Sequence, residues 1–249
     1  MQSGSLDDVR QLLTSHEGAE DVNWHPRFCV QGQPYITRIC TDCDTPLMAA
    51  VRREDIAMMR LLIAHGANVA EEIHGDFDGI CFLTCKTALL VALYTENEEV
   101  ITELVTSGAD VNQSLGRVGT VVHRCFDHNL NAPILAQFGA DPNLTDDFGN
   151  TVVSLIIFRC HDLHGDSKWS SAYESLRALL PATRDLNTIV QKNRKLVPGS
   201  LTPHMDIQCV TLFLQHGARI NYCQMYMTGS PEWASELQKY RKQHRERFI

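Results

Sequence analysis

Four residues in the N-terminal fifth of the chain have the types and spacings of zinc ligands. His25 and Cys29 form a His-x3-Cys pair, and Cys40 and Cys43 form a Cys-x2-Cys pair. Tetrahedral zinc sites take imidazole nitrogens and thiolates from closely spaced pairs of this kind. The pattern makes the four residues a candidate zinc site, provided that the segment between the pairs folds back on itself.

A second explanation accounts for one of these four residues, Cys43. Cys43 lies two residues before Thr45, just as Cys85 lies two residues before Thr87, so a recurring position in the chain accounts for one candidate ligand. Nine cysteines in 249 residues are an odd number in a chain that is not small, which is not the pattern of a disulfide framework. We therefore favour reduced thiols and expect no cofactor.

Two further groups combine a thiol with imidazoles. Cys125 lies between His123 and His128, and Cys160 stands next to His161. A cysteine becomes a strong nucleophile when a neighbouring base removes its proton, so such groups are candidates for covalent catalysis. The sequence contains no glycine-rich phosphate loop and no nucleophile-elbow motif that would support a further catalytic hypothesis.

Residues 44–70 indicate which elements must position these groups. Thr45 can cap a helix whose first residue is Pro46, because proline's fixed φ and missing N–H cost nothing there. Apolar residues within 56–63 form the buried face of a second helix, and Gly66 can take the left-handed conformation that ends it. The stretch predicts a unit of helix, short turn, helix and glycine stop.

The same pattern recurs along the chain. Thr87 and Thr120 open later copies, and Gly108 and Gly139 begin their closing Gly-Ala-Asp segments. The alternation resembles the ankyrin repeat, whose Thr-Pro-Leu-His and Gly-Ala-Asp-x-Asn segments recur at roughly 33 residues. One helical pair cannot bury its apolar face alone, so the resemblance implies a stack with a continuous core.

The resemblance implies an all-α fold, an ankyrin-repeat solenoid of about five to six helical pairs with β-hairpin fingers and a C-terminal capping helix. Long junctions around Gln31-Gly32 and Phe77-Asp78 are predicted to be two lengthened fingers, and residues 161–171 a polar insertion before a helix at 173–180. We predict a single domain over residues 1–249. Its expected units are residues 1–23 (partial), 24–70, 71–112, 113–143, 144–187 and 188–221, followed by a cap helix at 222–249.

The repeat register also bears on the catalytic hypothesis. His123 falls on the family's histidine after Thr-Pro-Leu, and Cys125 falls on a position that usually holds a small buried residue. The resemblance therefore implies structural roles for both residues. We expect the protein not to be an enzyme.

Composition narrows the choice of partners. The formal net charge of −8 argues against non-specific nucleic-acid binding, which needs a large basic surface. The longest uncharged apolar run, residues 151–158, is far shorter than the ~20 residues of a membrane span, and the first residues do not form a signal peptide. We expect a soluble protein of the cytoplasm or nucleus, with no membrane or nucleic-acid partner. The oligomeric state is left open.

The resemblance also implies where a partner binds. In ankyrin-like stacks the partner usually meets the concave side, made of finger tips and variable positions of each first helix. Carried onto this sequence, the register predicts these partner-binding residues: Arg52, Arg53, Tyr94, Thr95, Arg124, Asp127, His128, Phe158 and Arg159. Val91 falls on the same side. Arginine and aromatic side chains are typical of binding hot spots, and we expect the two consecutive arginines to be exposed charges of little value to folding.

These observations favour a non-catalytic scaffold that binds a protein partner through the concave face and finger tips. A first alternative is a substrate-recognition adaptor of a larger complex such as a ubiquitin ligase, although the short box that such families append after the stack is missing. A second alternative, from another class, is a sensor or enzyme that depends on zinc or on a thiol. Partner identity lies beyond the sequence.

Overall fold

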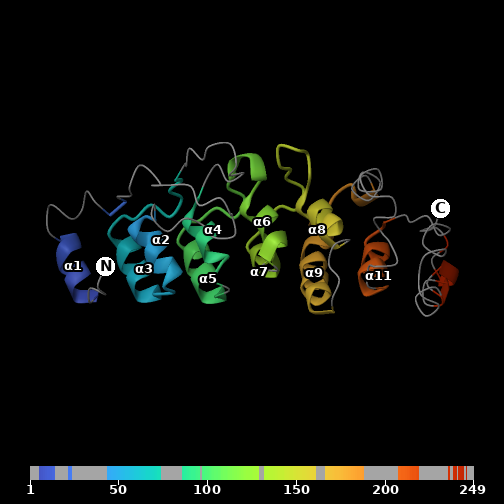
Figure 1. The fold of residues 1–249 in the computed structure, drawn as a ribbon, viewed down its shortest axis with the longest axis horizontal. Helices are drawn as coiled ribbons and strands as arrows, with labels where there is room; N and C mark the ends of the chain where they lie inside the picture. The colour runs from blue at the N-terminus through green and yellow to red at the C-terminus, as the bar shows by residue number, and fades with distance from the viewer. Residues whose placement is uncertain are drawn as a thin grey trace. The chain divides into compact units, whose positions relative to one another are not determined.

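A computed structural model of the chain describes residues 6–14, 22–23, 44–73, 86–95, 97–128, 132–160, 166–187 and 207–218, with positions 235, 238–239, 241–243 and 245 near the C-terminus. The chain divides into two compact units, Met1–Arg124 and Cys125–Ile249, whose boundary falls within one helix. The two units are described separately below. Figure 1 shows the helices of both.

Helical pairs make up the first unit. α2 packs against α3 and α4 against α5, while α2 also contacts α4 and α1 contacts α3. The first helices of consecutive pairs therefore lie side by side, as Figure 1 shows for α2 and α4. The elements are α1 (Leu6–Thr14), α2 (Pro46–Arg52), α3 (Ile56–Ala64), α4 (Ala88–Ala92), α5 (Glu98–Thr106), the 3-10 turn η1 (Gly116–Val118) and α6 (Val121–His128), which continues into the second unit.

Threonine caps start the first helices, as the sequence predicts. The hydroxyl of Thr45 accepts a hydrogen bond from the backbone N–H of Met48 at 3.1 Å, and Pro46 occupies the first helical position. Thr87 caps α4 in the same way through the N–H of Leu90, at 3.2 Å. Each cap satisfies an N–H group that the helix itself cannot pair.

Glycines end the second helices in the left-handed conformation. Gly66 has a φ of 91°, Gly108 of 103°, Gly139 of 83° and Gly217 of 94°. A side chain at these angles would meet the following carbonyl, so glycine is the favoured residue. The glycine stops predicted at Gly66, Gly108 and Gly139 are confirmed, and Gly217 has the same positive φ.

The core of the first unit lies between the two rows of helices. The side chains of Leu47, Met48, Met59 and Leu62 are buried in the best-formed pair. All five residues of α4 (Ala88–Ala92) are buried as well, which explains how so short a helix holds its place. Burial of an apolar face, more than helix propensity, stabilises helices of this length.

Polar contacts between consecutive pairs show the length of the structural repeat. Glu54 bonds Asn97, Arg60 bonds Glu103, and the side chain of Gln113 bonds the carbonyl of Ala70, each across 43 positions. This step is ten residues longer than the usual spacing of roughly 33. The extra residues lie in the junction between Ile73 and Lys86, whose backbones form an antiparallel bridge with two 3.0 Å hydrogen bonds.

The second unit is organised around α9. The helices α7, α8 and α11 all contact it. α9 begins at Asp166, so the polar insertion predicted for residues 161–171 is already helical in its second half, and that prediction is corrected. The elements are α7 (Ala132–Gln137), α8 (Val152–Cys160), α9 (Asp166–Leu179), the 3-10 turn η2 (Leu180–Ala182) and α11 (Ile207–Gln215).

Several predicted elements fall on residues that the structure does not describe. They are the tips of both long fingers, the first helix of unit 188–221, and most of the cap helix at 222–249. Among the described helices, none combines the length and apolarity that crossing a membrane requires.

Candidate partner-binding surface

The ends of α2 and α4 bring the first four predicted partner-binding residues onto adjacent helices. Arg52 and Arg53 end α2, and Tyr94 and Thr95 occupy the equivalent turn 42 positions later, directly after α4. Since α2 packs against α4, residues that are distant in sequence share this end of the helical row. We call Arg53, Tyr94 and Thr95 the first-row surface.

The side chains of this surface differ in exposure. Arg53 is exposed, whereas Tyr94 and Thr95 are half-buried. The hydroxyl of Thr95 donates to the carbonyl of Ala92 at 2.8 Å, and the N–H of Tyr94 bonds the carbonyl of Val91 at 3.1 Å. These bonds fix the backbone of the turn, so the surface presents a cation and an aromatic ring from a pre-organised segment.

Arg52 has an internal role that the sequence did not suggest. Its Nε and Nη2 atoms donate to the two carboxylate oxygens of Asp44 at 2.9 and 3.3 Å. Lys86, from the next repeat, forms an ion pair with the same carboxylate. The Asp44 side chain is only 7% exposed, and that of Arg52 is 30% exposed. The expectation that Arg52 is an exposed charge is wrong, because its side chain is partly buried and paired with Asp44.

Val91, which the repeat register predicts on the partner side, lies elsewhere. Its side chain is completely buried between neighbouring helices of the first unit. Val91 is buried because α4 has only five residues and needs its whole circumference for packing. Val91 belongs to the core.

The geometry of His123 explains its position in the repeat. The side chain is 1% exposed, and Nδ1 accepts the backbone N–H of Thr120 at 3.1 Å and lies 3.0 Å from its hydroxyl oxygen. Gly119 lies so close that an added Cβ would stand 2.8 Å from the imidazole ring. These contacts fasten the start of α6, which is a structural role for the ring.

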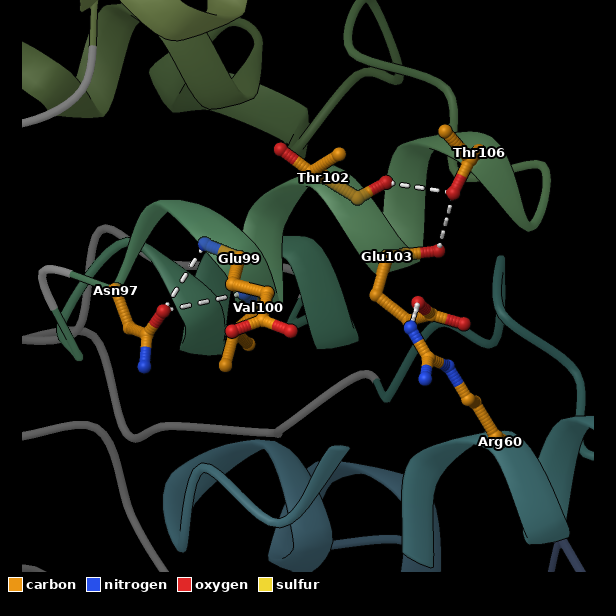
Figure 2. A network of polar contacts seen from close by, with 7 residues as sticks. All are labelled: Arg60, Asn97, Glu99, Val100, Thr102, Glu103 and Thr106. Carbon is orange, nitrogen blue, oxygen red and sulfur yellow. Dashed lines mark hydrogen bonds and ion pairs between the residues drawn. The ribbon is translucent and has the colours of Figure 1, made fainter. Parts of the chain in front are cut away.

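The opposite row, made of second helices, carries a polar network (Figure 2). Arg60 on α3 donates to Glu103 on α5 at 2.7 Å, and Asn97 caps α5 through the N–H groups of Glu99 and Val100. The hydrogen bond from Arg60 holds the pKa of Glu103 below its ordinary value and raises the pKa of Arg60. The network joins consecutive repeats.

The second unit contains an exposed aromatic residue that the sequence analysis missed. Phe148 is 65% exposed at the tip of the junction before α8. The carboxylate of Asp146 accepts the backbone N–H groups of Phe148 and Asn150 at 2.9 and 2.7 Å, and Gly149 has a φ of 72°. The Asp-x-x-Gly turn signal was legible in the sequence, but the exposure of the ring was not.

The other predicted residues lie on α6 and α8 or outside the described residues. Arg124 is partly buried on α6. The helices α6 and α8 include Asp127, His128, Phe158 and Arg159, but the side chains of these four are outside the described part of the chain. The candidate zinc ligands His25, Cys29, Cys40 and Cys43 also lie outside it. Within the described part, no three His, Cys, Asp or Glu side chains group as metal ligands would.

Comparison with known proteins agrees with this arrangement. Residues 1–114 match the family model described as ankyrin repeats, in three copies. The human mitochondrial disaggregase is 34% identical over 108 residues, a match that covers 38% of this chain. The chain spans only 15% of the length of that curated relative.

A solved structure, the crystal structure of the ankyrin repeat domain of Bcl-3, described as a unique member of the IkappaB protein family, is also similar. The alignment has a TM-score of 0.38 and 20% identity, and it covers 49% of this chain and 53% of the other. The match of residues 1–114 to the family model agrees with the helical pairs, caps and glycine stops of the first unit.

Proposed function

Because ankyrin repeats build residues 1–114 of this chain, we propose that it is a non-catalytic scaffold that binds a protein partner through the first-row surface. Ankyrin repeats generally mediate interaction between proteins. The single observation that carries the proposal is the packing of α2 against α4, which puts Arg53 and Tyr94 at the ends of adjacent helices.

The chemistry of this surface indicates the partner's chemistry. An exposed guanidinium binds carboxylates in a directional, bidentate way, and a half-buried tyrosine offers a large contact area at low entropic cost. The chain as a whole has a net charge of −8 and therefore repels acidic molecules that lack specific contacts. The surface fits a protein segment that presents an acidic group next to an apolar side chain.

We also propose partner contacts for the rest of the predicted set. It includes Arg124, Asp127, His128, Phe158 and Arg159. We propose an architecture of five to six helical pairs with two long fingers and a C-terminal cap helix. We also propose a cytoplasmic or nuclear location. The alternative role, a substrate-recognition adaptor of a larger complex such as a ubiquitin ligase, stays a proposal.

The proposal is tested by affinity purification with three forms of the full chain: wild type, Arg53→Glu and Tyr94→Ala. We expect a partner that binds the wild type and is weakened by both variants. Arg177→Glu serves as the matched control, because Arg177 is an exposed arginine on a second helix of the other unit, with a side chain 65% exposed. Partners that bind all four forms equally would overturn the proposal.

A further inference from the structure

Glu54 combines an unusual backbone conformation with an exposed position. It lies in the turn between α2 and α3, directly after Arg53, and its φ is 57°. Left-handed φ values are uncommon for residues other than glycine, and such an outlier points to a local role for the side chain. Core packing does not supply that role, because Glu54 is exposed.

The Glu54 carboxylate bonds the next repeat instead. Its Oε2 atom accepts a hydrogen bond from Nδ2 of Asn97 at 2.8 Å. Asn97 caps α5, since its Oδ1 atom accepts the N–H groups of Glu99 and Val100 at 3.0 and 3.4 Å. The Asn97 amide thus donates to the preceding repeat while it accepts from its own helix, so Glu54 holds the residue that starts α5.

Asn97 is bonded to the first-row surface as well. Its backbone N–H donates to the hydroxyl of Thr95 at 3.4 Å, and that hydroxyl donates to the carbonyl of Ala92 at 2.8 Å. A chain of hydrogen bonds therefore joins Glu54 to the turn that follows α4.

This chain of bonds connects the two parts of the first-row surface. Arg53 comes from the turn after α2, and Tyr94 and Thr95 come from the turn after α4. The helix α4 ends at Ala92, so its contact with α2 stops short of these residues. A partner that contacts both turns binds more tightly when their relative position is fixed beforehand, because less conformational entropy is lost on binding.

We infer that Glu54 is a positioning residue for the first-row surface. Its carboxylate holds the turn after α4 against the turn after α2, so that Arg53 and Tyr94 meet one partner together. The inference rests on the proposed function, and it gives Glu54 a role in partner binding that needs no contact with the partner. A hydrogen bond to a charged acceptor is stronger than a neutral one, which suits a link between two exposed turns.

Two substitutions at Glu54 remove the same charge and differ in the bond. The side-chain oxygen of glutamine in Glu54→Gln can still accept from Asn97, whereas Glu54→Gly loses the acceptor and fits the φ of 57° without strain. Relief of strain offsets the lost bond, so the melting temperature of Glu54→Gly should stay within about 2 °C of the wild type. Loss of the charge alone would favour an acidic partner, which is the opposite of the effect we expect from loss of the bond.

The first measurement needs no partner. Amide hydrogen exchange of the full chain reports local opening at the N–H groups of Tyr94 and Thr95, which bond carbonyls of α4 at 3.1 Å each. We expect exchange there to be roughly three- to tenfold faster in Glu54→Gly and unchanged in Glu54→Gln. Asn97→Asp keeps the cap acceptor but loses the donor, so it should accelerate the same exchange.

The second measurement is the dissociation constant of the partner protein purified with the wild type. Glu54→Gly should bind it roughly three- to tenfold more weakly, and Glu54→Gln should bind it at least as tightly as the wild type does. Wild-type exchange rates at Tyr94 and Thr95 in Glu54→Gly would overturn the inference, and so would equal affinities of the two Glu54 variants.

Failure of the positioning role is distinguishable from failure of the proposed function. A partner that loses affinity with Arg53→Glu but not with Glu54→Gly leaves the proposed function standing and removes only the role of Glu54. If Arg53→Glu weakens no partner, the proposed function fails, and the positioning role fails with it.

Discussion

Asp44 and Arg52 form a two-point hydrogen bond, with Nε and Nη2 of the guanidinium 2.9 and 3.3 Å from the two carboxylate oxygens. The pair joins the residue before the Thr45 cap to the last turn of the same helix, α2. Lys86, which precedes the next threonine cap, also pairs with Asp44. The ion pair between Lys86 and Asp44 therefore links the starts of the first helices of two consecutive repeats.

Because only Arg52 pairs with Asp44 in this way, Arg52 and the neighbouring Arg53 should differ in their contribution to stability. We predict that Arg52→Glu lowers the free energy of unfolding by roughly 1–3 kcal/mol, because it leaves the mostly buried Asp44 carboxylate next to a like charge. Arg53→Glu should change it by less than about 0.5 kcal/mol, since the residue is exposed. Urea unfolding of both variants measures the difference. Equal losses would show that the Asp44 network contributes nothing to stability.

A core prediction concerns the second helix of the best repeat. Leu62 is 4% exposed, and Leu62→Ala should destabilise the protein by roughly 2–5 kcal/mol through lost burial and the cavity that remains. Leu12→Ala, at an exposed leucine, is the control and should shift stability by about 0.5 kcal/mol or less. A small shift for Leu62→Ala in denaturant unfolding would mean that the assigned register of α3 is incorrect.

Two glycines with positive φ, 103° at Gly108 and 83° at Gly119, should respond differently to alanine. At Gly108 an added Cβ would have no heavy atom within 4 Å, so Gly108→Ala should cost only the left-handed strain of roughly 1–2 kcal/mol. At Gly119 the same Cβ would stand 2.8 Å from the His123 ring. Gly119→Ala should therefore destabilise more and disturb the bond between His123 and Thr120. Thermal melts of the two variants compare them, and equal shifts would contradict this account.

The pH dependence of stability offers a test at Asp141. The Asn143 backbone N–H and side-chain amide donate to its carboxylate at 2.9 and 2.7 Å, which lowers the pKa of Asp141 below its ordinary 3.8. A carboxylate with a lowered pKa in the folded state stabilises it above the unfolded pKa. That stabilisation disappears as the pH falls through the lower, folded value.

Wild type should therefore exceed Asp141→Asn in stability at pH 7, and the gap should narrow between about pH 4 and the lowered pKa. Carboxyl NMR titration checks the pKa directly. It should rise toward the ordinary value in Asn143→Ala, which removes the side-chain donor. A titration of Asp141 at or above 3.8 in the wild type would contradict the hydrogen-bond geometry.

The sequence predicted the features that depend on local chemistry. Thr45 and Pro46 start a helix because a hydroxyl cap and a proline fit the first turn, and Gly66 ends the pair because its φ of 91° favours glycine. These are short-range requirements that one repeat satisfies by itself. The recurrence of the pattern then implied the stacking of first helices, which the contact of α2 with α4 shows.

Features that depend on neighbours in space were missed. Arg52 and Lys86 lie 8 and 42 positions after Asp44 along the chain, and no motif marks the three residues. The burial of Val91 follows from the short length of α4, and the exposure of Phe148 follows from the path of one turn. None of these has a local pattern, because each is decided by which elements pack together.

The most direct test of the central claim is the dissociation constant of the partner isolated with wild-type protein, measured by calorimetry against Arg53→Glu and Arg177→Glu. We predict that Arg53→Glu weakens binding by about 1–2 kcal/mol or more without loss of fold, because it puts a like charge where the partner presents an acidic group. Arg177→Glu, with the same change of charge, should bind as the wild type does. Equal affinity of all three proteins would contradict a partner site on the first-row surface.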